Sequence, residues 1–273
     1  MSASPYIFDG PDPDVILRAP LQSGSYELKD FHVHKLVLSI ASITFRDTFS
    51  IPQPPRNTSN SDDGTLDVVQ VTESANVLEP FLQLIYPVDP PVIENLRLVD
   101  DLFRAADKYV AKGITTRLKK LLISPSFLKD DPIGVFTIAC CNDLEEEARL
   151  ALPHTFTIDV LGQISEERLQ AMTARAYHRL LTEHALHRKR LMGALDAAWR
   201  SLDPQSRCRC MERLGEKVHI RICGRPFLDR ETLENCLACV DNLGCAGAGS
   251  GSCIKTRSPF FLFDAMRRIK ALQ

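Results

Sequence analysis

Short apolar runs and longer amphipathic stretches alternate through the first half of the chain. Asp14–Ala19 is a run of β-branched and apolar residues, which predicts a strand. Tyr26–Leu28 and Phe31–His34 predict two further short strands, and Leu66–Val71 predicts another. We therefore expect a small sheet in this half of the chain.

The apolar period changes to that of a helix from Lys35 onward. Three apolar residues of this stretch fall on one helical face: Leu36, Val37 and Ile40. Ser42 can cap a second short helix, in which Phe45 and Phe49 lie one turn apart. The pattern predicts two consecutive short helices that bury these apolar side chains.

Three longer amphipathic segments follow the last predicted strand. Thr72 or Ser74 can cap the first of them. Leu96–Val110 predicts a helix that closes at Gly113, and Ile114–Ile123 predicts the next. Strands and helices thus mix in this half, which indicates an α+β fold.

Beyond Pro125 every periodic segment is helical. Asp131 can cap a helix with Pro132 at its first position. Asn142 or Asp143 can cap another, which opens with three glutamates. Ser165 begins a helical region that runs, with a break, to about Trp199.

These changes of pattern divide the chain into three predicted segments. We place a boundary near Ser124, so that residues 12–123 form the α+β domain, 124–201 a helical region and 202–273 a cysteine-rich tail. Residues 52–65 are rich in proline, asparagine, serine and aspartate, and we expect disorder there. Residues 244–252 contain only glycine, alanine, serine and one cysteine, which predicts a flexible linker.

Composition narrows the class of protein. The 273 residues are 44% hydrophobic and 25% charged, which suffices for a packed core, and the net charge is −2. A balance this close to neutral draws the whole chain to neither nucleic acid nor membrane. The sequence shows no signal peptide and no apolar run of about 20 residues, so we expect an intracellular protein, cytoplasmic or nuclear.

Several ordered motifs in residues 12–123 resemble the BTB/POZ family. Phe31–Ser39, followed by Ser42, Phe45 and Phe49, resembles the most recognisable stretch of that family. Leu82–Tyr86 is similar to the end of its third helix, and Ala105–Tyr109 to its fourth. The signature and core positions by this resemblance are Phe31, His34, Leu36, Phe45, Phe49, Tyr86, Ala106 and Tyr109. A finer resemblance, to BTB proteins of mushroom-type (basidiomycete) fungi with a helical tail after the BTB unit, is carried by Ile85–Pro87, Leu122–Leu128, Ile138–Cys140 and Leu144–Leu150.

The resemblance implies a BTB/POZ fold followed by an all-helical region, and a protein-binding adaptor that pairs with itself or another BTB domain. It places Asp14 and Lys35 near each other as a charged pair of the dimer interface. Some family members recruit cullin-type ubiquitin ligases through an apolar-x-acid motif. Phe49–Gln53 has no acid at the needed position, which disfavours a cullin partner.

Most of the signature residues are best explained as core, together with Ile40 and Phe81. For His34 we favour a structural hydrogen bond over a catalytic role. Cys140 and Cys141 lie in an apolar stretch and are expected to be buried. No nucleophile motif or acid/base pair can be identified from spacing, so we expect no enzyme activity.

Seven of the nine cysteines lie in residues 208–253. Four of them could supply the tetrahedral thiolate set that zinc prefers: Cys208, Cys210, Cys236 and Cys239. The alternative, which the spacing favours, is that Arg230–Val240 is a helix with Cys236 and Cys239 on its core face. No other cofactor is indicated.

Residues 175–230 contain thirteen Lys and Arg against six Asp and Glu. Such a stretch is most often the solvated side of a helix, and no aromatic residues alternate with the bases as single-strand binding would need. Nucleic acid is therefore a disfavoured partner. The second hypothesis for function is still a regulator linked to nucleic acid through a zinc-binding tail.

Overall fold

The computed structural model describes residues 12–200, apart from residues 23, 52–65, 157, 159 and 161–163. The chain separates into two compact units, residues 1–130 and 131–273. The boundary predicted near Ser124 precedes this division by one short helix, α6 (Pro125–Asp130). The two units are described one after the other.

A sheet of three strands forms one side of the first unit: β1 (Val15–Pro20), β2 (Leu28–Val33) and β3 (Asp67–Gln70). The strand order is β2-β1-β3; β1 runs antiparallel to β2 and parallel to β3. The prediction of two separate strands between Tyr26 and His34 was wrong. The ladder from Pro20 opposite Leu28 to Val15 opposite Val33 is continuous, so one strand forms.

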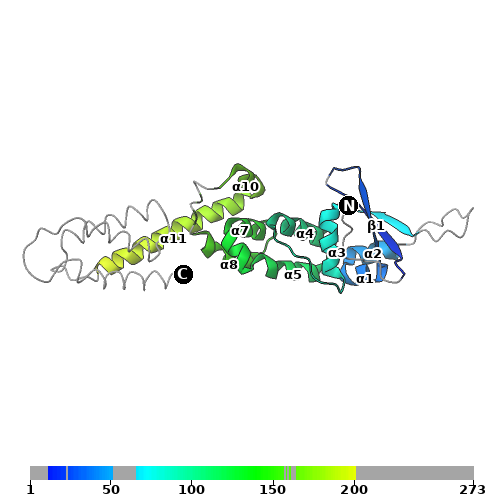
Figure 1. Ribbon diagram of the computed structural model, residues 1–273. Helices are drawn as coiled ribbons and strands as arrows, with labels where there is room; N and C mark the ends of the chain where they lie inside the picture. Colours follow the sequence, from blue (N-terminus) through cyan, green and yellow to red (C-terminus); the bar gives the residue numbers. More distant parts are fainter. Residues whose placement is uncertain are drawn as a thin grey trace, which may run out of the picture. The chain divides into compact units, whose positions relative to one another are not determined.

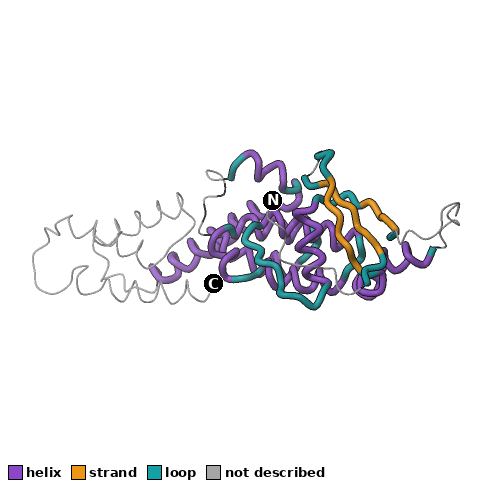
Figure 2. The backbone as a smooth tube through the Cα atoms, turned by 45° about the vertical axis from the view of Figure 1, so that its right-hand side comes forward, coloured by secondary structure: helices purple, strands orange, loops and turns teal. Residues whose placement is uncertain are grey.

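Most helices of this unit lie to one side of the sheet (Figures 1 and 2). Val15, Leu17 and Ala19 alternate along β1 and are fully buried on that face, as a half-buried strand requires. The helices are α1 (Lys35–Ala41), α2 (Ile43–Ser50), α3 (Ala75–Ile85), α4 (Leu96–Lys108), α5 (Lys112–Leu122) and α6.

One helix end differs from the prediction. α4 ends at Lys108, and Val110 adopts the left-handed conformation with φ of 50° before α5 begins at Lys112. Gly113 lies inside α5 and does not terminate α4. The N–H of Ala111 donates to the carbonyl of Ala106, which closes the last turn of α4 without a glycine.

The described part of the second unit is helical: α7 (Pro132–Cys141), α8 (Glu145–Thr155), α10 (Glu166–Ala171) and α11 (Ala174–Arg200). Asp131 caps α7 by accepting from the N–H of Gly134 at 2.9 Å, as predicted. Neither Asn142 nor Asp143 caps α8, whose N-cap is Leu144. Both end α7 instead: the Asn142 amide donates to the Ile138 carbonyl, and Asp143 has a φ of 54°.

Among the described residues, no helix combines the length and the apolar character that crossing a membrane requires.

Candidate protein-interaction surface

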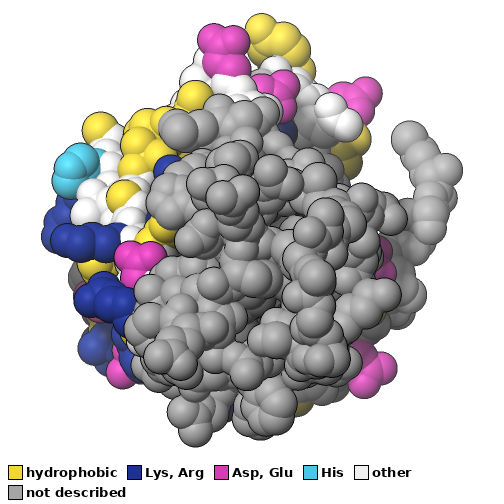
Figure 3. Space-filling model, turned by 90° about the vertical axis from the view of Figure 1, so that its left-hand side faces the viewer, with side chains coloured by type: hydrophobic (Ala, Val, Ile, Leu, Met, Phe, Trp, Pro, Cys, Tyr) yellow, Lys and Arg dark blue, Asp and Glu magenta, His cyan; other side chains and the backbone are white. Residues whose placement is uncertain are grey.

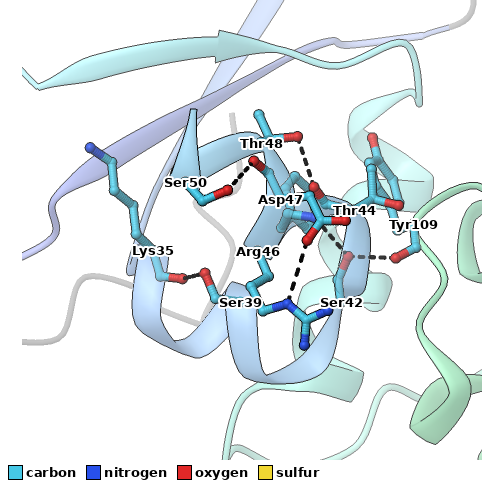
Figure 4. Close-up of polar contacts among 10 residues, drawn as sticks. Lys35, Ser39, Ser42, Thr44, Arg46, Asp47, Thr48, Ser50 and Tyr109 are labelled. Atoms are coloured by element: carbon cyan, nitrogen blue, oxygen red, sulfur yellow. Dashed lines mark hydrogen bonds and ion pairs between the residues drawn. The ribbon is translucent and has the colours of Figure 1, made fainter. Parts of the chain in front are cut away.

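Ser42 joins the two short helices to the end of α4 (Figure 4). Its hydroxyl donates to the Tyr109 carbonyl at 2.5 Å and accepts from the N–H of Phe45 at 3.1 Å, so the predicted cap is confirmed. The Thr44 hydroxyl donates to the Lys108 carbonyl at 3.1 Å. These bonds use carbonyls that a helix C-terminus leaves without helical partners, and they fix α2 against α4.

An aromatic cluster packs beneath this junction. The rings of Phe45 and Tyr109 stack with centroids 4.5 Å apart, and Phe49 and Phe81 extend the cluster at 5.8 Å from Phe45 and 5.4 Å from Tyr109. The Tyr109 hydroxyl donates to Glu73, which also binds the Lys108 ammonium at 2.7 Å. Burial opposes the charge of Glu73, but these two donors outweigh it and lower the pKa of the carboxyl.

His34 and Tyr86, two further signature residues, contact each other. The backbone N–H of His34 donates to the Tyr86 hydroxyl at 2.8 Å, and the ring Nδ1 of His34 lies 3.2 Å from the same oxygen. This is the structural hydrogen bond expected of His34. The contact holds the end of β2 to the end of α3.

The structure brings Asp14 and Lys35 together, but not as a pair of charged side chains. The Asp14 carboxylate accepts from the backbone N–H of Lys35 at 2.7 Å, at the first residue of α1. The Lys35 ammonium instead forms an ion pair with Asp67 of β3 at 2.8 Å. Within one chain Asp14 therefore serves the N-terminus of α1, where a carboxylate is favourable. Its place in a dimer interface stays a prediction.

The expectation that Leu36 and Ile40 belong to the core was wrong. Their exposed fractions are 70% and 79%, whereas Leu38 is fully buried. Residues 36 and 40 lie one helical turn apart, and residue 38 lies roughly opposite them. The helical period showed which residues share a face, but α1 turns its other face to the core. Of the other signature residues, Phe31, Phe45, Tyr86, Ala106 and Tyr109 are buried and Phe49 is half-buried.

The family model of the BTB/POZ domain matches residues 21–126. The chain contains a BTB/POZ domain. BTB/POZ domains generally act as protein-interaction modules rather than enzymes. The search of curated proteins found no match to this chain.

The three-stranded sheet and its flanking helices confirm the predicted α+β BTB/POZ fold, with a helical region after it. β1 precedes the matched residues but pairs with β2 and β3 in the same sheet, so it completes the BTB/POZ domain. The segment limits of 12–123, 124–201 and 202–273, like the fungal origin, stay predictions.

The outward face of the BTB/POZ sheet carries a polar centre between apolar residues. Arg18 of β1 and Asp30 of β2 are opposite in register and form two hydrogen bonds of 2.7 Å. The Arg18 guanidinium lowers the pKa of the Asp30 carboxyl. Leu28 and Val68 are exposed on the two outer strands at 56% and 44%.

The helical unit holds a pocket of about 940 Å³ between the end of α7, the start of α8 and α11. Arg179 of α11 crosses it to Glu145 of α8 with two hydrogen bonds of 2.8 and 2.6 Å. Cys140 lines the pocket half-buried, and burial raises the pKa of its thiol. Cys141 is exposed, so its predicted burial was wrong: it follows the last apolar turn of α7 and points away from the core.

The four cysteines predicted as zinc ligands, and the whole tail from residue 201 onward, lie outside the described residues. Among the residues that are described, no group of three or more His, Cys, Asp or Glu side chains could hold a metal ion.

The basic stretch is described as far as Arg200. Arg188, Lys189 and Arg190 of α11 are all exposed. On the face drawn in Figure 3, Lys and Arg side chains gather on one side of the described surface, with acidic side chains among them. This mixture fits the solvated helix side favoured from the sequence.

Proposed function

We propose that this protein is a non-catalytic adaptor whose BTB/POZ domain self-associates through the exposed apolar face of α1. The observation that carries the proposal is the exposure of Leu36 and Ile40, at 70% and 79%, one turn apart on the same side of α1. A branched aliphatic side chain exposed singly needs no explanation, but two on one face of a short helix indicate a contact surface.

The surroundings of α1 favour a rigid contact surface. Asp14 holds its first residue, the Lys35–Asp67 ion pair ties it to β3, and Ser42 ends it against the Tyr109 carbonyl. A helix held at both ends loses little freedom when a partner binds, which lowers the cost of association.

In a dimer with two-fold symmetry, each of these side chains would be buried once in each subunit. Burying a Leu or Ile side chain contributes about 2 kcal/mol. In a symmetric dimer each α1 would present its Leu36 and Ile40 to the partner, so the same surface serves both subunits. In the double variant Leu36→Glu, Ile40→Glu, like charges would face each other across the two-fold axis. We expect the dissociation constant of the dimer to rise by at least about a hundredfold.

The test is the mass of the full chain in solution across a concentration series, measured by light scattering. We expect a dimer for the wild-type chain and a monomer for the double variant. Because both side chains point to solvent, the double variant should keep its helical circular dichroism. Val92→Glu is the matched control, since Val92 is an apolar residue of the same unit, 85% exposed, outside α1.

A dimeric double variant would contradict the proposal, and so would a wild-type chain that stays monomeric throughout the series. If the Val92→Glu variant were also monomeric, the loss of the dimer would result from the added negative charge and not from a change in the α1 face. A stable complex with a different BTB protein that the α1 variant loses would assign the same surface to hetero-association.

A further inference from the structure

Two histidines of α11 are buried against the end of α8. His184 and His187 are exposed by only 5% and 6%, although histidine usually keeps its polar tip in water. Both face Phe156, the C-cap residue that follows α8: the ring centroids lie 5.1 Å away for His184 and 4.0 Å for His187. The self-association proposed above makes no use of this contact.

The hydrogen bonds around His184 determine which of its nitrogens carries a proton. The Thr155 hydroxyl donates its single proton to the Leu152 carbonyl at 2.6 Å. The ring Nε2 of His184 lies 3.0 Å from the same hydroxyl oxygen, so Nε2 must be the donor there. His184 is thus a fixed hydrogen-bonding link from α11 to the last turn of α8.

His187 makes the other half of the contact by stacking on Phe156. Its ring lies nearly parallel to that of Phe156, at an interplanar angle of 7°. Burial and the nearby Arg190 guanidinium lower the pKa of His187 below its ordinary value of 6.5. A protonated ring would be attracted to the face of Phe156, whereas burial and the Arg190 guanidinium both oppose its charge.

The charged and titratable residues that neighbour this contact in the sequence come from both helices. α8 contributes His154, next to Thr155, and α11 contributes Glu183, Arg188 and Arg190. Arg190 is the charge that acts on His187, and its sign opposes a second positive charge. The Glu183 carboxylate acts instead on Arg179, on the pocket side of α11.

We propose that the contact of Phe156 with His184 and His187 is an acid-sensitive lock, in which protonation of His187 releases α11 from α8. The folded state disfavours the protonated ring, so the stability that the lock contributes is complete above about pH 6.5. That stability falls as the pH drops through the lowered pKa of His187. Release of α11 would also open the pocket that it shares with α7 and α8, including the half-buried Cys140.

The test is amide hydrogen exchange of the full chain, followed by mass spectrometry at pH 7.5 and 5.5. Labelling times are scaled for the intrinsic change of exchange rate with pH. In the wild-type chain we expect scaled exchange in α8 and α11 to rise at least fivefold at pH 5.5, while the strands of the BTB/POZ domain keep their protection. His187→Phe keeps a flat ring on Phe156 but cannot be protonated, so it should abolish the rise.

The matched control is His178→Gln, because His178 is an exposed histidine of the same helix. This variant should behave as the wild-type chain does. A rise that persists in His187→Phe, or the absence of a rise in the wild-type chain, would overturn the proposal. If His187→Phe does not fold at pH 7.5, the pKa of His187 measured by NMR in the wild-type chain decides: a value of 6.5 or above refutes the lock.

Discussion

Ser42 shows how one small side chain can fix the junction between three helices. It is 1% exposed, and its hydroxyl serves as donor to α4 and as acceptor for α2 at the same time. Both partners are backbone groups that have no other helical partner at these helix ends. Removing the hydroxyl leaves the Phe45 N–H without its cap, and the Tyr109 carbonyl keeps only the longer bond of 3.4 Å from the Thr44 N–H.

We therefore predict that Ser42→Ala lowers the free energy of unfolding of the BTB/POZ domain by about 2 kcal/mol, from the lost cap and the lost hydrogen bond to the Tyr109 carbonyl. Urea unfolding followed by circular dichroism measures this. The control is Ser39→Ala, because Ser39 is half-buried and donates only to the Lys35 carbonyl within its own helix. The Lys35 carbonyl still accepts a hydrogen bond within α1 when this hydroxyl is removed. A loss of more than roughly 1 kcal/mol in the control would therefore show that the effect is not specific to Ser42.

Most helix starts could be predicted, including that of α3, whose N-cap is Ser74 although its side chain makes no cap hydrogen bond. Ser42, Asp131 and Ser165 each accept a hydrogen bond from a backbone N–H of the following first turn, as the sequence indicated. α8 has no side-chain cap, so the polar residues before it suggested a cap that the structure does not use. Val110, two residues after the end of α4, adopts a conformation that β-branched residues rarely adopt, and a sequence pattern that relies on glycine misses it.

The exposed apolar face of α1 could not be predicted from the sequence, for a related reason. A helical period groups Leu36 with Ile40, but it does not say which face of α1 the sheet and the other helices cover. That choice depends on how α1 lies against its neighbours, and only the structure shows Leu38 inside and the other two outside. The BTB/POZ fold itself could be predicted because its signature combines local periods with specific buried aromatic residues.

At the scale of elements, α10 depends on one neighbour. It has only six residues, too few to be stable alone. α7 holds it through Asp131, which forms a bidentate ion pair with Arg168, and through the Cys141 thiol, which donates to the Ala171 carbonyl at 3.7 Å. We predict that Arg168→Met increases amide exchange in α10 about two- to fivefold, since partly exposed ion pairs contribute up to about 1 kcal/mol.

The matched variant is Asp131→Ala, which also removes the cap of α7 at Gly134. It should increase exchange in both α10 and α7, whereas Arg168→Met should leave α7 unchanged. Equal effects of the two variants on α7 would contradict the separate roles assigned to the two side chains.

At the scale of the whole molecule, the compact unit of residues 1–130 extends past the domain match, which ends at residue 126. Residues 127–130 lie beyond the match and form most of α6, in which Phe127 is buried. We predict that a chain ending at residue 130 folds cooperatively with a dispersed NMR spectrum. A chain ending at residue 126 should lose about 2 kcal/mol of stability through the truncation of the helix that holds Phe127. Equal stability of the two fragments would show that α6 belongs to the helical unit.

The strand order β2-β1-β3 also determines when each strand can pair while the chain is synthesised on a ribosome. β1 finds β2 immediately after it in the chain, and hairpins of this kind form within about ten microseconds. The other edge of β1 has to wait for β3, because Val15 pairs with Asp67, which is synthesised only after both α1 and α2. During that interval β1 presents an unpaired edge of backbone donors and acceptors, which is the template for pairing with another nascent chain. The period of translation between β2 and β3 is therefore the stage at which this domain is most vulnerable to aggregation.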